Sequence, residues 1–335
     1  MNAPILSVKG LKTHFRLSAG LLKKSAKVVH AVDGVSFDLM RGETLSIVGE
    51  SGCGKSTVGR SILRLVQPTE GEVILDGRRV DNLSQAAFRP LRKQLQVVFQ
   101  DPFSSLNPRM KVRDIIAEPI RNFGILASER EIAARTRELL AKVGLPSDAG
   151  DRFPHQFSGG QRQRIGIARA LAAEPEIIIC DEAVSALDVS VKAQIVNLLV
   201  DLQSELGLAL LFISHDLAIV EHMTHRVAVM YLGSIVETAT RRQLFATPKH
   251  PYTQALLSAV PVPNPDEKRE RTILKGEVPS PISPPSGCRF HTRCPLAFDR
   301  CSVERPQLSD VGEGQMVACH LYIDTKVSAT AGAVA

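Results

Sequence analysis

Residues 44–57 decide the fold and read TLSIVGESGCGKST. The apolar run Thr44–Val48 predicts a short strand, and an apolar stripe predicts a helix over Lys55–Val66. Between them, residues 49–57 match the pattern G-x-x-x-x-G-K-[ST] in its expected strand–turn–helix context. The glycines let backbone N–H groups converge on phosphate oxygens, and the helix presents its positive end to the anion. The stretch therefore predicts a nucleoside triphosphate site.

Every position of this glycine-rich turn is a candidate nucleotide contact. Lys55 would place its charge on the β- and γ-phosphates, and the Ser56 hydroxyl would ligate Mg²⁺. Cys53 is interpreted as a spacer and not as a redox site. The candidate residues are Gly49, Glu50, Ser51, Gly52, Cys53, Gly54, Lys55, Ser56 and Thr57.

A second apolar strand ends in two carboxylates. Residues 177–182 read IIICDE, and a buried strand would aim Asp181 and Glu182 at the carboxyl edge of the sheet, where ligands bind in such folds. Asp181 is placed to hold Mg²⁺ through water. Glu182 is placed first to orient the attacking water and second to accept its proton, because phosphoryl transfer depends more on positioning than on proton removal.

A Ser-Gly-Gly turn opens a basic helix. Residues 157–161 read FSGGQ and precede a helix predicted over Gly160–Ala172. The turn is a candidate second anion site, because a helix N-terminus attracts negative charge. Two phosphate half-sites in one chain suggest head-to-tail pairing of two subunits, and the alternative is a plain helix cap. The candidate residues are Ser158, Gly159, Gly160 and Gln161.

Length and composition are those of a globular protein of about two domains. The 335 residues carry 41 Lys and Arg against 35 Asp and Glu, and we interpret the net charge of +6 as solvated surface. Trp is absent, so the stacking platforms of single-stranded nucleic acid binders are not expected. No apolar run approaches the ~20 residues of a membrane helix and residues 1–11 lack a signal-peptide pattern, so we expect a cytoplasmic location.

Predicted strands alternate with predicted helices, which indicates a largely parallel α/β sheet. Ser128 and Glu131 form a capping-box pattern before a helix that Gly144 ends. The basic residues 12–30 predict an extended hairpin or loop, and the prolines of residues 261–285 predict a linker. The remaining predicted elements are strands over Ile5–Val8, Val32–Leu39, Val73–Leu75, Gln96–Phe99, Ala209–Ile213, Val227–Met230 and Ile235–Val236, and a helix over Val191–Leu206.

Taken in order, these motifs resemble the ATP-binding subunit of an ABC transporter. Residues 49–57 resemble its Walker A motif, residues 177–182 its Walker B motif, and residues 157–161 its signature motif. Phe157 stands where Leu is commonest in the signature. Ala183 stands where the family usually has Pro, and we expect this departure to have a small effect on rate.

Four further positions extend the resemblance. Gln100 resembles the Q-loop glutamine that touches Mg²⁺, and His215 resembles the switch histidine that contacts the γ-phosphate. Residues 185–188 resemble the D-loop, which ends in Asp188, and Phe15 takes the place of the aromatic side chain that stacks on adenine. The resemblance implies ATP hydrolysis with Glu182, His215 and Gln100 as catalytic residues. It implies Mg²⁺ as a cofactor, held by Ser56, Gln100 and Asp181.

The resemblance also implies a domain plan. Residues 1–240 would form a P-loop (RecA-like) α/β ATPase domain with an antiparallel β subdomain and a helical subdomain at about residues 101–157. Residues 241–325 would form a Pro-rich C-terminal extension. Residues 326–335 are expected to be a disordered tail.

The resemblance narrows to dipeptide and oligopeptide importers. Residues 100–109 (QDPFSSLNPR), 250–257 (HPYTQALL) and 276–281 (GEVPSP) are similar to segments of their ATPases. This implies three kinds of partner: a second ABC ATPase in a heterodimer, two transmembrane permease subunits and an external peptide-binding protein. It also implies that this chain lies at the periphery of the inner membrane, on the cytoplasmic face. No nucleic acid partner is expected. Nickel, glutathione and sugar importers share this type of ATPase. Two further hypotheses are a non-transport ABC ATPase and an inactive scaffold subunit.

Four of the six cysteines cluster near the C-terminus, as Cys288, Cys294, Cys301 and Cys319. Four thiolates suit Zn²⁺ or a [4Fe–4S] cluster, and the spacing C-x₅-C-x₆-C-x₁₇-C lacks the C-x₂-C knuckles usual for zinc. The resemblance implies an iron–sulfur cluster here, while zinc and unligated thiols stay open. His291 and His320 are possible substitute ligands, and otherwise we expect them to be exposed polar residues.

Overall fold

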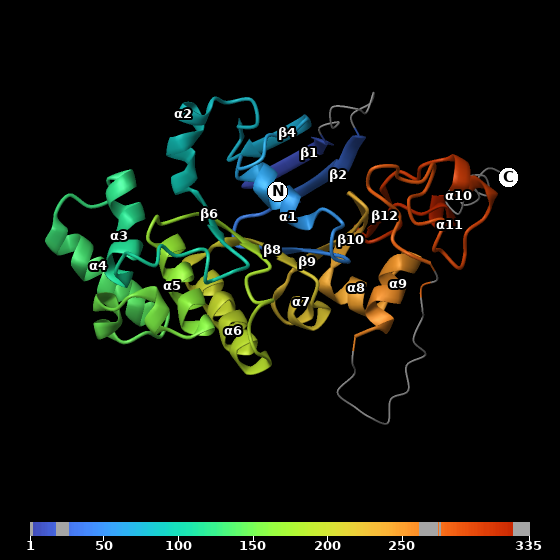
Figure 1. Ribbon diagram of the computed structural model, residues 1–335. Helices are drawn as coiled ribbons and strands as arrows, with labels where there is room; N and C mark the ends of the chain where they lie inside the picture. The colour runs from blue at the N-terminus through green and yellow to red at the C-terminus, as the bar shows by residue number, and fades with distance from the viewer. Residues whose placement is uncertain (1–2, 18–26, 261–273, 275, 324–335) are drawn as a thin grey trace. The chain divides into compact units, whose positions relative to one another are not determined.

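The computed structural model describes residues 3–17, 27–260, 274 and 276–323 (Figure 1). The described chain divides into two compact units. The first unit comprises residues 1–7, 38–45 and 73–219, and the second comprises residues 8–37, 46–72 and 220–335. The predicted tail over residues 326–335 lies outside the described residues, as do residues 261–273 and 275 of the predicted linker. Residues 276–285 of that linker are described and contain neither helix nor strand.

The first unit contains a parallel sheet in the order β8–β7–β6. Its strands are β6 (Leu95–Val98), β7 (Ile177–Asp181) and β8 (Ala209–Ser214), and every position of β7 and β8 is buried. Ile177 lies opposite Leu95 on one side and opposite Ala209 on the other. The predicted parallel sheet is confirmed for these strands, whose continuous apolar sequences are typical of strands covered on both faces.

Helices of the first unit lie beside this sheet and pack against one another (green and yellow-green in Figure 1). α3, α4 and α5 pack against one another, and α5 also packs against α6. The capping box predicted at Ser128 is present at the start of α4. The helices of the first unit are α2 (Gln85–Phe88), α3 (Val112–Phe123), α4 (Glu129–Lys142), α5 (Gly159–Leu171), α6 (Val189–Leu206) and α7 (Leu217–Met223), whose end passes into the second unit, with 3₁₀ turns at Arg89–Lys93, Ser147–Asp151 and Pro154–Gln156.

The second unit contains an antiparallel sheet in the order β11–β12–β10–β9. The predicted hairpin is confirmed as β9 (Arg226–Tyr231) and β10 (Ser234–Thr240), with β-bulge geometry between Ile235 and Glu237. β10 also pairs with β12 (Met316–Val317), so residues near the C-terminus join this sheet. The other elements of this unit are α8 (Arg241–Ala246), α9 (Pro251–Ser258), α10 (Asp299–Val303), β11 (Ser309–Asp310) and α11 (His320–Ile323).

Four strands cross the boundaries between the units. β3 (Thr44–Val48) is buried at every position and leads through the glycine-rich turn into α1 (Lys55–Ile62). β1 (Leu6–Leu17) is longer than predicted, and the next strand, β2 (Lys27–Leu39), begins earlier than predicted. Residues 12–17 and 27–30 are therefore strand. Residues 18–26 lie outside the described residues. β4 (Glu70–Leu75) pairs antiparallel with β5 (Arg78–Arg79).

One predicted helix end is wrong, and one helix has no counterpart among the predicted elements. α1 ends at Ile62 and not at Val66, because Arg64 adopts a left-handed conformation with φ of 54°. The sequence does not predict α3, because Pro119 inside it disfavours a helix. Burial of one apolar face of α3 outweighs that cost. Among the described residues, no helix is long and apolar enough to cross a bilayer.

Candidate active site

The phosphate loop connects β3 to α1 within the second unit. The Lys55 ammonium is buried and donates hydrogen bonds to the carbonyl oxygens of Gly49 (2.8 Å) and Glu50 (2.9 Å). The residue before α1 is Gly54, so no side chain caps that helix and its first N–H groups can turn to an anion. The Lys55 charge and the first N–H groups of α1, both predicted from the sequence, therefore lie together at the phosphate loop.

Two glycines of the loop are required by close backbone approaches. Gly49 and Gly54 have φ values of 155° and 107°, and a Cβ on either would lie 2.1 Å from the Met230 oxygen or 2.0 Å from the Ala31 oxygen. Cys53 is buried in the same turn, and burial raises the pKa of its thiol. A buried, protonated thiol fits the interpretation of Cys53 as a spacer.

The predicted catalytic residues lie together in the first unit. Gln100 Nε2 donates to Glu182 Oε2 at 2.9 Å, and His215 Nδ1 lies 3.5 Å from Glu182 Oε1. The Glu182 side chain is 14% exposed, whereas that of His215 is 52% exposed. One carboxylate is therefore held between an amide and an imidazole at the carboxyl ends of β6, β7 and β8. Asp181, which precedes Glu182 in the sequence, is the last residue of β7 and is buried.

Glu182 has an unusual backbone conformation. Its φ is 48°, and its N–H donates to the Ile213 oxygen at 3.0 Å. Both the N–H and the hydroxyl of Ser185 donate to the Glu182 oxygen at 3.0 Å, so the predicted D-loop closes this turn. Ala183 is buried within it. A left-handed conformation is costly for a residue with a long side chain, and these hydrogen bonds hold Glu182 in it.

The predicted signature segment forms the start of α5. Ser158 Oγ accepts from the Gln161 N–H at 3.3 Å, and Gln161 Oε1 accepts from the Ser158 N–H at 3.1 Å, which is a capping box. Further along α5, Gln163 donates to the Phe99 oxygen at 3.3 Å and Arg169 donates to the Ser105 oxygen at 2.6 Å. The same helix thus presents the Ser-Gly-Gly turn and braces the chain on both sides of Gln100.

Two other predicted positions are exposed. Phe15, on β1 in the second unit, is 39% exposed, which leaves its ring available for stacking. Asp188 is exposed and occupies the cap position of α6, although its side chain makes no cap hydrogen bond. The structure does not assign either residue a ligand.

Within the second unit, Tyr252 and Arg293, from the part of the chain expected to form a C-terminal extension, contact the phosphate loop, which the sequence does not predict. The Tyr252 hydroxyl accepts from the Glu50 N–H at 2.9 Å. Arg293 donates to both carboxylate oxygens of Glu50, at 2.8 and 3.2 Å. The only signal for Arg293 in the sequence is its position next to Cys294.

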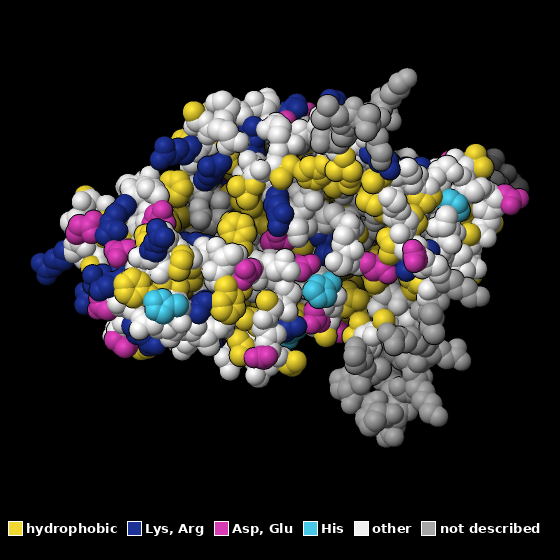
Figure 2. Space-filling view, viewed as in Figure 1, with side chains coloured by type: hydrophobic (Ala, Val, Ile, Leu, Met, Phe, Trp, Pro, Cys, Tyr) yellow, Lys and Arg dark blue, Asp and Glu magenta, His cyan; other side chains and the backbone are white. Residues whose placement is uncertain are grey.

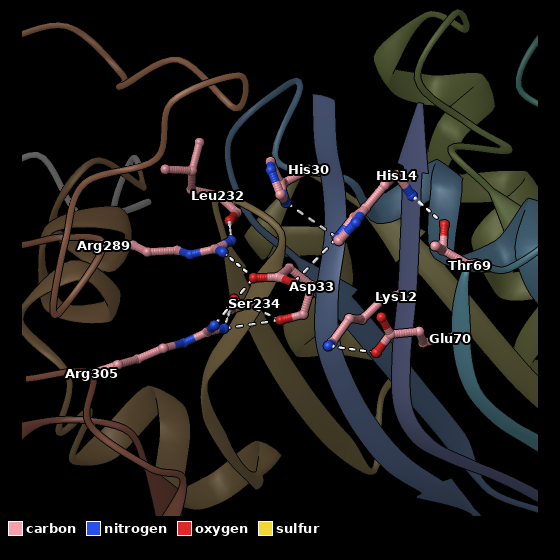
Figure 3. A network of polar contacts seen from close by, with 10 residues as sticks. All are labelled: Lys12, His14, His30, Asp33, Thr69, Glu70, Leu232, Ser234, Arg289 and Arg305. Atoms are coloured by element: carbon pink, nitrogen blue, oxygen red, sulfur yellow. Dashed lines mark hydrogen bonds and ion pairs between the residues drawn. The ribbon is translucent and has the colours of Figure 1, made fainter. Parts of the chain in front are cut away.

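A second ion-pair network joins the extension to β2 (Figure 3). Arg289 and Arg305 both pair with Asp33, and Arg305 also donates to the Ser234 hydroxyl at 2.7 Å. Burial alone would raise the pKa of Asp33, but the two guanidinium groups outweigh it and hold the pKa of that carboxyl below its usual range. This network fastens residues 289 and 305 to the strand.

Asp33 also belongs to a group that could be taken for a metal site. His14 Nε2 lies 3.3 Å from Asp33 Oδ1 and 3.3 Å from His30 Nδ1. Among the described residues, only these three offer three ligand atoms within 4.8 Å of one another. A divalent cation there would face the guanidinium groups that already share the Asp33 carboxylate, so the chemistry of the group favours an ion-pair brace over a metal site.

The four clustered cysteines lie close enough to influence one another. Burial, together with the nearby thiols of Cys288, Cys294 and Cys301, raises the pKa of Cys319 to about 11. Each possible substitute ligand already has one ring nitrogen beside a carbonyl oxygen: His291 Nδ1 lies 2.8 Å from the Cys288 oxygen, and His320 Nε2 lies 2.8 Å from the Glu304 oxygen. The expectation that His320 is exposed is wrong, since the residue is 2% exposed.

Comparisons with known proteins identify the family. Residues 32–185 match the ABC transporter family, and residues 236–301 match the oligopeptide/dipeptide transporter C-terminal region. The chain is similar to y4tS of Sinorhizobium fredii, a probable peptide ABC transporter ATP-binding protein. The two are 56% identical over 321 residues, which cover 96% of this chain and 91% of y4tS. The chain belongs to the ABC transporter ATP-binding protein family.

Other relatives and solved structures agree with this assignment. The ABC ATPase is 54% identical to the oligopeptide transport ATP-binding protein AppF of Bacillus subtilis, over 95% of this chain and 97% of AppF. A dimeric structure of the ATP-binding cassette MJ0796 in a post-hydrolysis state with ADP and Pi matches with a TM-score of 0.63 and 29% identity, over 71% of this chain and 99% of that one. CbiO1 of Clostridium perfringens, part of the transporter complex cbiONQ, matches with a TM-score of 0.62 and 28% identity, over 73% and 92% of the two chains. These structures share the ABC ATPase fold.

Proposed function

We propose that this ABC ATPase hydrolyses ATP to energise the import of dipeptides or oligopeptides through partner membrane subunits. The chemistry rests on one observation, the placement of the Glu182 carboxylate between Gln100 and His215. The substrate class rests on the oligopeptide/dipeptide transporter C-terminal region and on relatives named for peptide transport. An importer of nickel, glutathione or sugars with the same ATPase type is the alternative, and a non-transport ABC ATPase is a second.

In hydrolysis, the phosphate loop would bind the nucleotide, and the group around Glu182 would act on the attacking water. Lys55 and the loop N–H groups would bind the phosphates, and Phe15 would stack on adenine. Mg²⁺, held by Ser56, Gln100 and Asp181, would neutralise charge that develops on the phosphate oxygens. Glu182 would orient the attacking water and accept its proton, with His215 sensing the γ-phosphate.

A head-to-tail pair of ATPase subunits would complete each site. The exposed Ser158 and its capping box present the N-terminus of α5, whose positive end suits the phosphates of a nucleotide held by another subunit. Asp188 would lie at the same interface. In keeping with importers of this type, we propose a heterodimer with a second ABC ATPase beneath two permease subunits, with peptide delivered by an external binding protein.

The helical subdomain of residues 101–157 would transmit ATP binding to the membrane subunits. Figure 2 shows Lys and Arg side chains interspersed with Asp and Glu side chains over α3 and α4. These helices and the adjacent 3₁₀ turn line a pocket of about 440 Å³, with Arg113, Arg121 and Arg137 among its charged lining. A charged pocket on a helical surface would suit a polar segment of a permease, and with such a partner this chain would lie at the cytoplasmic face of the membrane.

The four clustered cysteines would hold a [4Fe–4S] cluster. Cys288, Cys294 and Cys301 all act electrostatically on the Cys319 thiol, so the four side chains lie near one another. A zinc ion held by the same four thiolates, and four unligated thiols, are the alternatives. The metal would replace the protons of four thiols and tie together a segment with little core of its own. Anaerobic purification followed by iron and sulfide assay tests this: a colourless, iron-free protein would refute it.

The transport proposal is tested by recovering this chain from detergent-solubilised membranes of its source and identifying its partners by mass spectrometry. We expect two multi-span proteins, a second ATPase and a binding protein. A Glu182→Gln variant loaded with ATP should retain more of the second ATPase, because ATP closes the pair and slow hydrolysis delays its opening. Recovery of ribosomes or DNA-bound proteins in place of permeases would refute transport and leave the ATPase chemistry standing.

A further inference from the structure

The second residue of the phosphate loop is an acid, and its charge is neutralised from the C-terminal extension. Glu50 follows Gly49 in the loop and carries a carboxylate that is 28% exposed. Arg293 meets it with both terminal nitrogens, at 2.8 and 3.2 Å, and the Arg293 side chain is only 8% exposed. This is a bidentate pair, the strong and geometrically specific form of an ion pair.

The loop is also held through its backbone. The Glu50 N–H donates to the Tyr252 hydroxyl at 2.9 Å, and the Tyr252 ring packs on Tyr231 and Phe290 with ring centroids 4.7 and 5.4 Å away. Tyr252 itself is fully buried. Both the peptide group and the carboxylate of Glu50 are therefore fixed by residues beyond the ATPase sheet.

One short segment supplies most of these contacts. Between Cys288 and Cys294, Arg289 pairs with Asp33 on β2 (Figure 3), Phe290 enters the aromatic group, and Arg293 pairs with Glu50. Cys288 and Cys294, two of the four clustered cysteines, thus lie at the ends of a segment whose side chains contact the phosphate loop and the strand β2. The anchoring of Arg289 at one end leaves Arg293 little freedom to move away from Glu50.

The charge of Glu50 is a problem for an ATP site unless it is paired. Phosphates bound on the N–H groups of this loop would lie near a carboxylate of the same sign, and like charges repel strongly where water is partly excluded. We propose that Arg293 is a positioning residue for ATP binding, which neutralises Glu50 and fixes the phosphate loop. The inference rests on the proposed ATP site and adds the Cys288–Cys294 segment to it.

A double-variant experiment separates this role from general stabilisation. The affinity for ATP is measured by equilibrium binding in the purified full chain for the wild type, Arg293→Ala, Glu50→Gln and the double variant, with thermal unfolding in parallel. Arg293→Ala should weaken ATP binding about tenfold, because it leaves an unpaired carboxylate beside the phosphates. Glu50→Gln gives the reference affinity of a phosphate loop that lacks this carboxylate, against which the double variant is compared. The double variant should recover most of the affinity that Arg293→Ala loses, since the repelling charge is gone.

Two further variants complete the test. Arg300→Ala is the matched control, since Arg300 is a partly exposed arginine of the same extension that pairs with Glu304, and its ATP affinity should be unchanged. Arg293→Lys should retain much of the affinity because the charge is kept. Equal affinity of Arg293→Ala and the wild type, or a double variant no better than Arg293→Ala, would overturn the proposal. Absence of ATP binding by the wild type would instead refute the proposed function.

Discussion

Glu182 is held in a conformation that most side chains avoid. Its φ of 48° is maintained by hydrogen bonds from Ser185 and to Ile213, and its carboxylate reaches both Gln100 and His215. Strain of this kind persists only where surrounding contacts over-determine it. The result is a carboxylate with a fixed direction, which is what orientation of an attacking water requires.

A Glu182→Gln variant tests this role. The amide has nearly the same shape, but it has no charge and cannot accept the proton of the water. We expect ATP to bind and single-turnover hydrolysis to slow by about 10²–10³-fold. Glu205→Gln is the control, since Glu205 is exposed at the end of α6 and pairs with Lys142. Unchanged hydrolysis in Glu182→Gln would contradict the assignment.

At the scale of elements, α4 and α5 begin in the same way. Both start with a capping box, formed by Ser128 with Glu131 and by Ser158 with Gln161. Only the second contains the Gly-Gly turn that resembles the signature motif. The chain therefore provides an internal control for separating helix stability from nucleotide chemistry.

Ser128→Ala and Ser158→Ala should each lower the free energy of unfolding by about 1 kcal/mol, the usual cost of losing such a cap. Only Ser158→Ala should also lower ATP hydrolysis, by about tenfold or more, because its hydroxyl is proposed to face a nucleotide across a subunit pair. Unfolding and steady-state hydrolysis are measured on both variants. Equal hydrolysis rates would leave Ser158 with a capping role alone.

How far the sequence predicts these elements depends on how local their causes are. The capping box at Ser128 and the buried strand β7 are predictable because neighbouring residues determine them. α3 is not, since Pro119 disfavours the helix that burial of its apolar face stabilises. The predicted end of α1 is wrong because no feature of the sequence indicates that Arg64 adopts a left-handed conformation.

The candidate site shows the same limit. Its motif residues are predicted individually from spacing and resemblance, and the structure brings the side chains of Gln100, Glu182 and His215 together. The pair between Arg293 and Glu50 is not predicted, because it joins positions 243 residues apart and neither forms part of a motif with the other. Contacts of that kind depend on tertiary folding and have no local signal.

At the scale of the whole molecule, a buried histidine makes stability depend on pH. Burial lowers the pKa of His250 to about 3, and its Nδ1 accepts from the Tyr252 N–H at 3.0 Å. In the unfolded chain its pKa is about 6.5. The unfolded state therefore binds a proton at a pH where the folded state does not. The contribution of His250 to stability is complete above about pH 6.5 and is lost progressively as the pH falls toward 3.

Unfolding measured from pH 7.5 to 4.5 on the wild type and on His250→Asn tests this. Asn can still cap α9 but does not titrate. We expect the wild type to lose more stability than the variant as the pH falls through about 6.5. Parallel curves for the two proteins would show that His250 is not the titrating group.

The central claim, that ATP hydrolysis by this chain energises peptide import, is tested most directly by uptake of a labelled dipeptide and a labelled oligopeptide. Cells of the source organism that lack the chain are complemented with the wild type or with Glu182→Gln, at matched protein levels. We predict that the wild type restores uptake of at least one of the two peptides and that Glu182→Gln does not. Peptide uptake that is the same with and without the chain, in cells where the purified wild type hydrolyses ATP, would contradict the claim.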